Sequence, residues 1–256
     1  MTPEPRRQLA QVVADVATLL GWLSLDGGRP ERAWRHFQTG ALAAAEAGDP
    51  LLQAFATAES GYVLLAADRP HDALARIDAG ESALDGIAHL ALRAWICAAR
   101  AEALAATGDG DGCRAALDRA YQHLQTAADG GSPPAPYVDY LDQWHLHRWA
   151  GNCLATLGHA DAAGVIEEAL AQLDPSFVRA QAGLVIDLAV AHAAVEDLDQ
   201  ACVAASHGVR LAAETRSARQ LARARALRDA LRPAAGSVAY AEFLDQLGEA
   251  SAPERT

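Results

Sequence analysis

A pairing of a small residue with a second residue four positions later recurs about every forty residues along the chain. The first members of the pairs are separated by 40, 40, 49 and 39 residues, and they are Ala33, Ala73, Cys113, Ala162 and Ala201. Another small residue stands twelve positions before each of them, at Gly21, Gly61, Ala101, Ala150 and Ala189. Two helices cross closely only where one has little side chain, so each set predicts one antiparallel helical hairpin. Hairpins repeated at a fixed period indicate a stacked array.

The pattern therefore predicts an all-α fold, a right-handed α-solenoid of five antiparallel hairpins with a C-terminal capping helix pair. The capping pair is expected at about 214–232 and 237–248. We expect a single solenoid domain over 1–249 and a disordered tail over 250–256. Half of the residues are apolar, alanine dominates and only 5% are aromatic. Alanine favours helices, and β-branched residues are too scattered to predict strands.

The charge balance argues against a general nucleic-acid surface, because such a surface needs a basic face and the net charge is −12. Six arginines lie between Arg216 and Arg232. At helical spacing they form two opposed stripes, which fits a solvated helix surface or, alternatively, a site for an anionic partner.

The N-terminal residues lack the apolar region of a signal peptide, and no uninterrupted apolar run reaches the roughly 18 residues of a membrane span. The four cysteines have no C-x-x-C spacing and occupy helical positions suited to small apolar residues. We expect buried thiols and a cytoplasmic protein with no membrane association. No nucleotide-binding, calcium-loop or zinc motif is present, so we expect no cofactor and no metal.

The repeat resembles the tetratricopeptide repeat, with Leu20-Gly21 at its L-G step and Ala33 and Phe37 at its A-x3-F step. The Trp and Tyr of that signature are not kept, and the period is longer. The segments GWLSLDGG, RAWRHF, EAGDPLL and LGHADAAGVIEEAL are also similar to the C-terminal sensor half of high-GC bacterial helix-turn-helix transcriptional regulators. That resemblance implies a sensor module whose DNA-binding half is not in this chain.

The tetratricopeptide register implies which residues of each first helix line the concave groove. Its inner rows contain Trp22, Phe55, Tyr62, Trp95, Glu102, Trp144 and His147. Rings in a groove offer a large contact area with polar tips free to hydrogen-bond. If they line a groove, they should be more exposed than Leu20 or Phe37. The alternative is that these rings pack between helices.

The segment 136–153 holds the densest group of rings and titratable residues. Tyr137, Tyr140 and Trp144 follow a 3–4 spacing, which predicts one shared helical face and extends the ligand-binding set. Asp142 and His145 are three apart and suited to a carboxylate–imidazole pair. If the chain is an enzyme, Asp142, His145 and Tyr140 are the candidates for moving a proton.

The favoured function is a sensor that binds a small molecule or peptide in the groove without catalysis, with no direct contact to nucleic acid. A biosynthetic enzyme such as an acid–base-assisted cyclase or isomerase, and a protein-interaction scaffold that binds a protein partner, are the alternatives. The Gly- and Pro-rich segment 128–136 lengthens one repeat and predicts a protruding loop, either a lid over the groove or a passive insertion.

Overall fold

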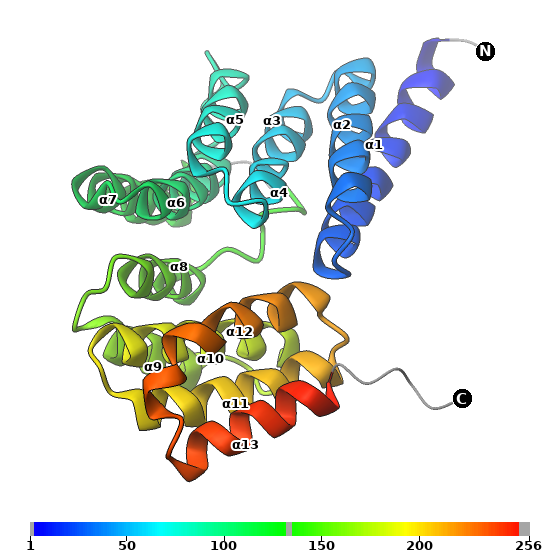
Figure 1. The fold of residues 1–256 in the computed structure, drawn as a ribbon. Helices are drawn as coiled ribbons and strands as arrows, with labels where there is room; N and C mark the ends of the chain where they lie inside the picture. The colour runs from blue at the N-terminus through cyan, green and yellow to red at the C-terminus, as the bar shows by residue number, and fades with distance from the viewer. Residues whose placement is uncertain (1–2, 132–134, 251–256) are drawn as a thin grey trace, which may run out of the picture. The chain divides into compact units, whose positions relative to one another are not determined.

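The computed structural model describes residues 3–131 and 135–250, and within these ranges it contains helices and turns but no β-strand (Figure 1). The predicted all-α class is therefore confirmed for this part of the chain. The tail predicted over 250–256 lies outside the described residues, apart from Ala250.

The chain divides into two compact units. Unit 1 comprises Met1–Leu25 and Arg29–Trp149, and unit 2 comprises Asp26–Gly28 and Ala150–Thr256. The division after Trp149 falls inside helix α8 (Gln143–Thr156). The single solenoid expected over 1–249 stays a prediction.

Unit 1 contains the first part of α8 and the helices that precede it. These are α1 (Pro3–Asp26, whose last residue is counted with unit 2), α2 (Pro30–Ala47), α3 (Pro50–Glu59), α4 (Gly61–Ala66), α5 (Pro70–Ser82), α6 (Leu90–Thr107) and α7 (Gly110–Thr126). A π-helical turn, Ala127–Gly131, follows α7.

Proline and capping residues set the helix starts in unit 1. Pro30 and Pro70 lie in the first turns of α2 and α5, where a backbone N–H has no partner within the helix, so its absence costs no hydrogen bond. Pro50 plays the same part in α3, and the Asp49 carboxylate before it accepts a hydrogen bond from the Leu52 amide at 2.9 Å. Gly48 ends α2 in the left-handed conformation, with φ of 76°, which glycine adopts without strain.

Helices α1 and α2 pack closely at two glycines. A Cβ built on Gly21 would lie 2.7 Å from the Phe37 ring, and one on Gly40 would lie 2.6 Å from the Thr18 hydroxyl oxygen. One residue number falls as the other rises, so the two helices run antiparallel. The ring of Phe37, which has no exposed surface, occupies the space that a side chain at residue 21 would need.

The same arrangement joins the next helices of unit 1. A Cβ on Gly61 would lie 2.8 Å from the Ile77 side chain, and one on Gly80 would lie 2.8 Å from the backbone oxygen of Ala54. The hairpin pattern predicts a single helix as the first arm of this hairpin, whereas the structure has a break at Ser60 between α3 and α4. Adjacent serine and glycine residues are a common cause of such helix breaks.

Unit 2 contains the end of α8 and the helices after it. These are α9 (Ala162–Gln172), α10 (Val178–Ala194), α11 (Leu198–Glu214), α12 (Ala218–Ala230) and α13 (Val238–Glu249), with a 3₁₀ turn at Arg232–Ala234. Helix α11 packs against α10, α12 and α13. A Cβ on Gly208 would lie 2.6 Å from Ile186, and one on Gly151 would lie 2.6 Å from Ile166. The contact predicted at Ala150 is therefore made by Gly151, one residue later.

Two further sequence predictions concern buried thiols and the segment 128–136. Cys97, Cys113, Cys153 and Cys202 are all buried, as predicted. Part of the predicted loop, residues 132–134, lies outside the described residues. Before it, Gly130 leaves helical geometry with φ of 92°, and after it residues 136–140 form turns.

By length and composition, one helix in the described ranges is apolar enough to cross a membrane. It is Glu4–Asp26 in α1, with a mean hydropathy of 1.3. Asp15 interrupts this stretch, and one face of the helix is buried at Ala14 and Thr18.

Candidate functional site

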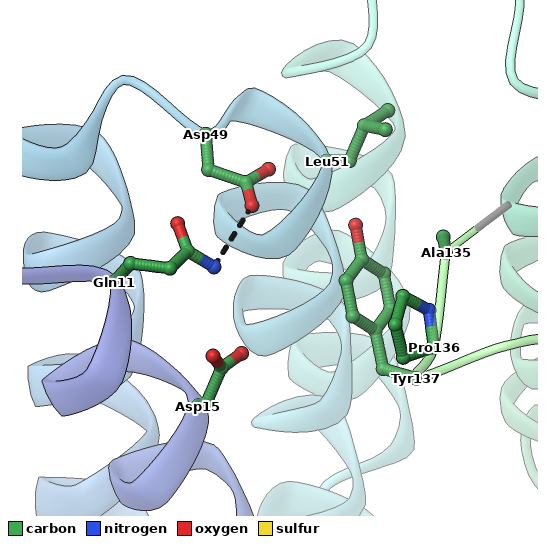
Figure 2. A pocket seen from close by; sticks show the side chains of 7 residues that line it. All are labelled: Gln11, Asp15, Asp49, Leu51, Ala135, Pro136 and Tyr137. Carbon is green, nitrogen blue, oxygen red and sulfur yellow. Dashed lines mark hydrogen bonds between the residues drawn. The ribbon is translucent and has the colours of Figure 1, made fainter. Parts of the chain in front are cut away.

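A pocket of about 470 Å³ opens in unit 1 between α1, the start of α3 and the segment before α8 (Figure 2). We call it the Tyr137 pocket, and its lining consists of Gln11, Asp15, Asp49, Leu51, Ala135, Pro136 and Tyr137. Three stretches far apart in sequence therefore supply two carboxylates, one amide, one phenol ring and apolar surface.

The polar side of the pocket is built on α1 and on the N-cap of α3. The amide nitrogen of Gln11 donates a hydrogen bond to Asp49 Oδ2 at 3.1 Å, and Asp49 Oδ1 accepts from the Leu52 backbone (Figure 2). Burial raises the pKa of Asp15; its hydrogen bond with Gln11 acts in the opposite direction, and the negative charge of Asp49 raises the pKa further. Two carboxylates close enough to affect one another give this wall a negative potential.

Tyr137 forms the facing wall. The short segment that carries it is held by Asp139, whose carboxylate accepts a hydrogen bond from the Ala135 amide at 2.8 Å, and by Val138, which is buried. Burial, with the charges of Asp49, Asp15 and Asp139, raises the pKa of Tyr137 above its usual value. The phenol therefore stays protonated at neutral pH and is able to donate a hydrogen bond into the pocket.

A network of rings supports Tyr137 from behind. The Tyr137 ring lies 4.9 Å from that of Phe55, and Phe55 lies 4.7 Å from Trp95. The ring of Trp95 also makes edge contacts with Tyr62 at 6.2 Å and Trp149 at 6.5 Å. These spacings fall within the range favoured by aromatic pairs. The Tyr137 wall of the pocket is thus in direct contact with the aromatic interior of unit 1.

Hydrogen bonds fix the polar tips of this network. The indole N–H of Trp95 donates to the Tyr140 hydroxyl at 3.0 Å, and that of Trp149 donates to the Tyr62 hydroxyl at 3.0 Å. Trp22 extends the network from α1 through an edge contact with Tyr62 at 6.4 Å. The indole N–H groups of Trp95 and Trp149 are therefore occupied inside the unit rather than available to a ligand.

Glu59, at the end of α3, lies near this network. Although the residue keeps some accessible surface, burial of its carboxyl group raises the pKa to about 8. The pKa of Tyr140 is raised to about 12, first by burial and then by the Glu59 charge, with the Trp95 hydrogen bond and Arg148 acting in the opposite direction. A carboxyl group with such a pKa is largely protonated at neutral pH.

The three candidates for acid–base chemistry lie together at the start of α8. Asp142 Oδ1 lies 2.8 Å from His145 Nδ1, and the same oxygen accepts the His145 backbone N–H at 2.8 Å. Burial acts to raise the pKa of Asp142, but the hydrogen bonds and charge of His145 outweigh it, and the net pKa is lowered. The rings of Tyr140 and His145 lie 5.2 Å apart. The carboxylate therefore serves as a helix cap as well as an imidazole partner.

Trp144 and His147 belong to a second group of rings. Their ring centres lie 5.3 Å apart, and His147 Nδ1 is 3.0 Å from the hydroxyl of Tyr121 on α7. The prediction that Tyr137, Tyr140 and Trp144 share one helical face is wrong. Helix α8 begins only at Gln143, after the Asp142 cap, so the two tyrosines precede the helix.

The prediction that the groove residues are more exposed than Leu20 or Phe37 is also wrong in part. Leu20 is 40% exposed, whereas Trp95, Phe55 and Tyr62 are 2%, 5% and 6% exposed. The physical reason is that these rings pack on one another, while Leu20 lies on the outward face of α1. Trp22, Tyr137 and Glu102 on α6 are partly buried, and Tyr140 is 48% exposed.

Sequence reasoning missed the polar residues of the site. Gln11, Asp49 and Glu59 belong to no sequence motif. Only the folded structure brings the first two to the pocket and Glu59 close to the ring network. Asp15 also falls on an inner row of the predicted tetratricopeptide register, but it is not among the predicted binding residues, most of which are aromatic. In the described part of the chain, no group of three or more His, Cys, Asp or Glu residues is arranged to hold a metal ion.

Comparisons with protein-family models and with curated proteins find no match for this chain.

Proposed function

We propose that this chain is a recognition module that binds a small molecule or peptide carrying an ammonium or guanidinium group in the Tyr137 pocket. The observation that supports this most directly is the pairing of Asp15 and Asp49 across from a phenol ring in a pocket of about 470 Å³. That volume is within the usual range of ligand pockets.

The chemistry of the walls favours a cation with an apolar portion. The two carboxylates attract positive charge, and their mutual repulsion is relieved when a cation binds between them. The face of Tyr137 suits a cation–π contact, and its hydroxyl is a donor or acceptor for a polar group. Leu51 and Pro136 offer apolar surface beside these groups.

At the level of the fold, we propose a tetratricopeptide-like solenoid of five hairpins with a C-terminal capping pair, acting as a sensor. The close contacts of Gly21 with Phe37, Gly61 with Ile77 and Gly151 with Ile166 support this repeat register. In this proposal ligand binding in unit 1 is the input to a regulatory response.

The direct test is calorimetric titration with short peptides that contain arginine, each matched with a peptide in which citrulline replaces it. Citrulline keeps the shape of the side chain but removes its charge. We expect arginine peptides to bind at least about tenfold more tightly, because a hydrogen bond to a charged group contributes about 1.5–3 kcal/mol. Binding that does not distinguish the two peptides would contradict the proposal.

Variants connect that binding to the pocket. Asp15→Asn removes one charge, and Asp49→Asn removes the other while keeping a side chain that caps α3 well. We expect each to weaken binding of arginine peptides about tenfold. Asp118→Asn is the matched control, because Asp118 is exposed on α7 of the same unit and does not line the pocket.

An acid–base enzyme is the second candidate, and the close approach of Asp142, His145 and Tyr140 is the observation that favours it. In such a cyclase or isomerase, His145 would take a proton from the substrate and Asp142 would orient the imidazole. Its test is product formation from a supplied substrate. His145→Gln should abolish turnover, while Asp15→Asn should leave the catalytic rate constant unchanged.

A further inference from the structure

Helix α1 carries a continuous stripe of exposed apolar side chains. Its seven members are between 40% and 59% exposed, and they are Leu9, Val12, Val13, Val16, Leu19, Leu20 and Leu23. We call this set the α1 stripe. The spacings of three and four residues place its members on one face of the helix. The opposite face, with Ala14, Thr18 and Gly21, is buried and packs on α2.

The α1 stripe is symmetric about Val16. Leu9 and Leu23 lie seven residues on either side of it, and the inner pairs are Val12 with Leu20 and Val13 with Leu19. Each position thus has an apolar counterpart at equal distance in the other direction. An isologous dimer contact requires this self-complementarity, because residue i of one copy meets residue j of the other, and j meets i. A different partner would impose no such symmetry.

The exposed area suits a contact between two copies. Seven side chains that are about half exposed present roughly 600 Å² in each copy, so a symmetric contact would bury roughly 1,200 Å², the lower end of standard protein interfaces. Patches larger than a few hundred square ångströms are uncommon on monomers. The 3–4 spacing is also that of a two-stranded helical seam.

Charge disfavours a membrane as the occupant of this face. Interfacial helices that bind anionic membranes carry basic residues along their polar face. Here Asp15 lies beside the α1 stripe, and the whole chain has a net charge of −12, so an anionic bilayer would repel it. The members of the stripe are themselves uncharged, so no like charges would meet across a contact between two copies.

We propose that two copies of this chain associate through their α1 helices, antiparallel, with the two-fold axis at Val16. In this dimer Leu9 of one copy packs against Leu23 of the other, and the two Val16 side chains meet. The proposal is independent of ligand binding in the Tyr137 pocket.

The first experiment measures mass in solution by sedimentation equilibrium at micromolar concentrations. We expect twice the 26.8 kDa of one chain for the wild-type protein. Val16→Glu should give the single-chain mass, because two like charges would then meet at the axis. Leu42→Glu is the matched control: Leu42 is 74% exposed on α2 and outside the stripe, so its replacement should leave the dimer intact.

A charge-swap experiment separates this contact from a general loss of folding. Val16→Glu and Val16→Lys should each be monomeric with an unchanged helical circular dichroism spectrum. Mixed in equal amounts, they should recover the doubled mass, because only the mixed pair brings opposite charges together at the axis. Two folded variants that remain monomeric when mixed would overturn the proposed geometry.

Cross-linking tests the antiparallel orientation without disturbing the charge. The native cysteines are all buried, so a new surface thiol is the accessible one. Under a mild oxidant, Val16→Cys should form a disulfide-linked dimer, and Leu9→Cys should link to Leu23→Cys rather than to itself. Self-linking of Leu9→Cys would indicate a parallel pair, and a wild-type monomer, with or without binding to phosphatidylcholine–phosphatidylglycerol vesicles, would equally overturn the proposal.

Discussion

Unit 1 contains all five tryptophans and four of the five tyrosines of the chain, whereas unit 2 has one tyrosine, two phenylalanines and no tryptophan. The interior of unit 1 is closed by large rings whose N–H and O–H groups pair with each other, as Trp95 does with Tyr140. The interior of unit 2 is built from smaller side chains and contains a buried carboxylate, Asp187, that accepts a hydrogen bond from Asn152 at 2.8 Å and pairs with Arg223.

This difference shows that the interiors of two helical units can be filled by different chemistry, with aromatic rings in unit 1 and an ion pair among smaller side chains in unit 2. Large rings fill much of the interior of unit 1, and they can support a ligand-facing residue such as Tyr137. An ion pair inside a helical unit specifies which helices meet, since either partner alone would leave an unpaired charge. Unit 1 is therefore the better candidate for ligand recognition, and the polar network of unit 2 is better explained as structural. Because all tryptophans are in unit 1, their fluorescence reports on that unit, while circular dichroism reports on both.

The largest expected effect is that of Trp95→Ala. Trp95 is almost fully buried and contacts Phe55, Tyr62 and Trp149, so its loss should lower the free energy of unfolding by about 3–5 kcal/mol. Guanidinium unfolding followed by the remaining tryptophans measures this. Trp144→Ala, at a partly exposed position, is the control and should cost less. A loss below about 1 kcal/mol for Trp95→Ala would mean that the ring is a replaceable surface group and that our account of unit 1 is wrong.

In unit 2 we expect Asp187→Ala to lower the free energy of unfolding by about 2–3 kcal/mol. Removing one partner of a fully buried ion pair typically costs 3–5 kcal/mol, but Arg223 keeps 31% of its side chain exposed and can regain water. Circular dichroism should detect the loss. Asp229→Ala, exposed on α12, should stay close to wild type. An equally small effect for both variants would remove the distinction that we draw between the interiors of the two units.

The next comparison concerns a feature that the units share. Gly61 and Gly208 each face an isoleucine, and a Cβ there would lie 2.8 and 2.6 Å from the Ile77 and Ile186 side chains. Replacing either glycine with leucine should lower the free energy of unfolding by about 1–3 kcal/mol. Gly164→Ala is a suitable control, since no atom lies within 4 Å of a Cβ built there. Thermal unfolding of the three variants measures these losses. A leucine variant as stable as Gly164→Ala would show that its unit tolerates overpacking.

Several close helix contacts could be predicted from the sequence because they depend on the size of local side chains. Gly21 and Phe37 contact one another as a hairpin crossing requires, and Pro30 and Pro70 begin helices, because both features follow from backbone and side-chain geometry a few residues away. The small-residue pattern selected Ala150 rather than Gly151 since both are small and adjacent, and only the rotation of α8 against Ile166 distinguishes them.

The candidate site was less accessible to sequence reasoning. Scarce rings such as Trp95 stand out, but whether a ring faces solvent or other rings depends on distant neighbours. The Trp149–Tyr62 hydrogen bond, for example, joins residues 87 positions apart. Asp49 looks like an ordinary helix cap, and nothing local indicates that it shares a pocket with Tyr137. Glu59 is likewise marked only by its burial.

The smallest expected effect is a pH dependence confined to unit 1. The folded-state pKa of Glu59 is raised to about 8 from an ordinary value of 4.5, so the folded protein binds the proton more tightly than the unfolded chain does. The contribution of Glu59 to the free energy of unfolding should therefore fall as pH rises between these two values. The lowered pKa values of His123 and His207 act in the acid range instead, where stability falls as pH drops below about 6.5. Burial also raises the pKa of the Cys97 and Cys202 thiols from their ordinary value of 9.0, so these groups lower stability as pH approaches 9. Measurements from pH 7 to 8 thus isolate Glu59. Because Glu59 is partly exposed, we expect the free energy of unfolding to fall by only about 1 kcal/mol over this range.

Guanidinium unfolding monitored by tryptophan fluorescence should show the decline for the wild-type protein, and Glu59→Gln, which stays neutral, should abolish it. A decline of equal size in Glu59→Gln would assign the effect to another group and leave the interior of unit 1 without its titratable carboxyl.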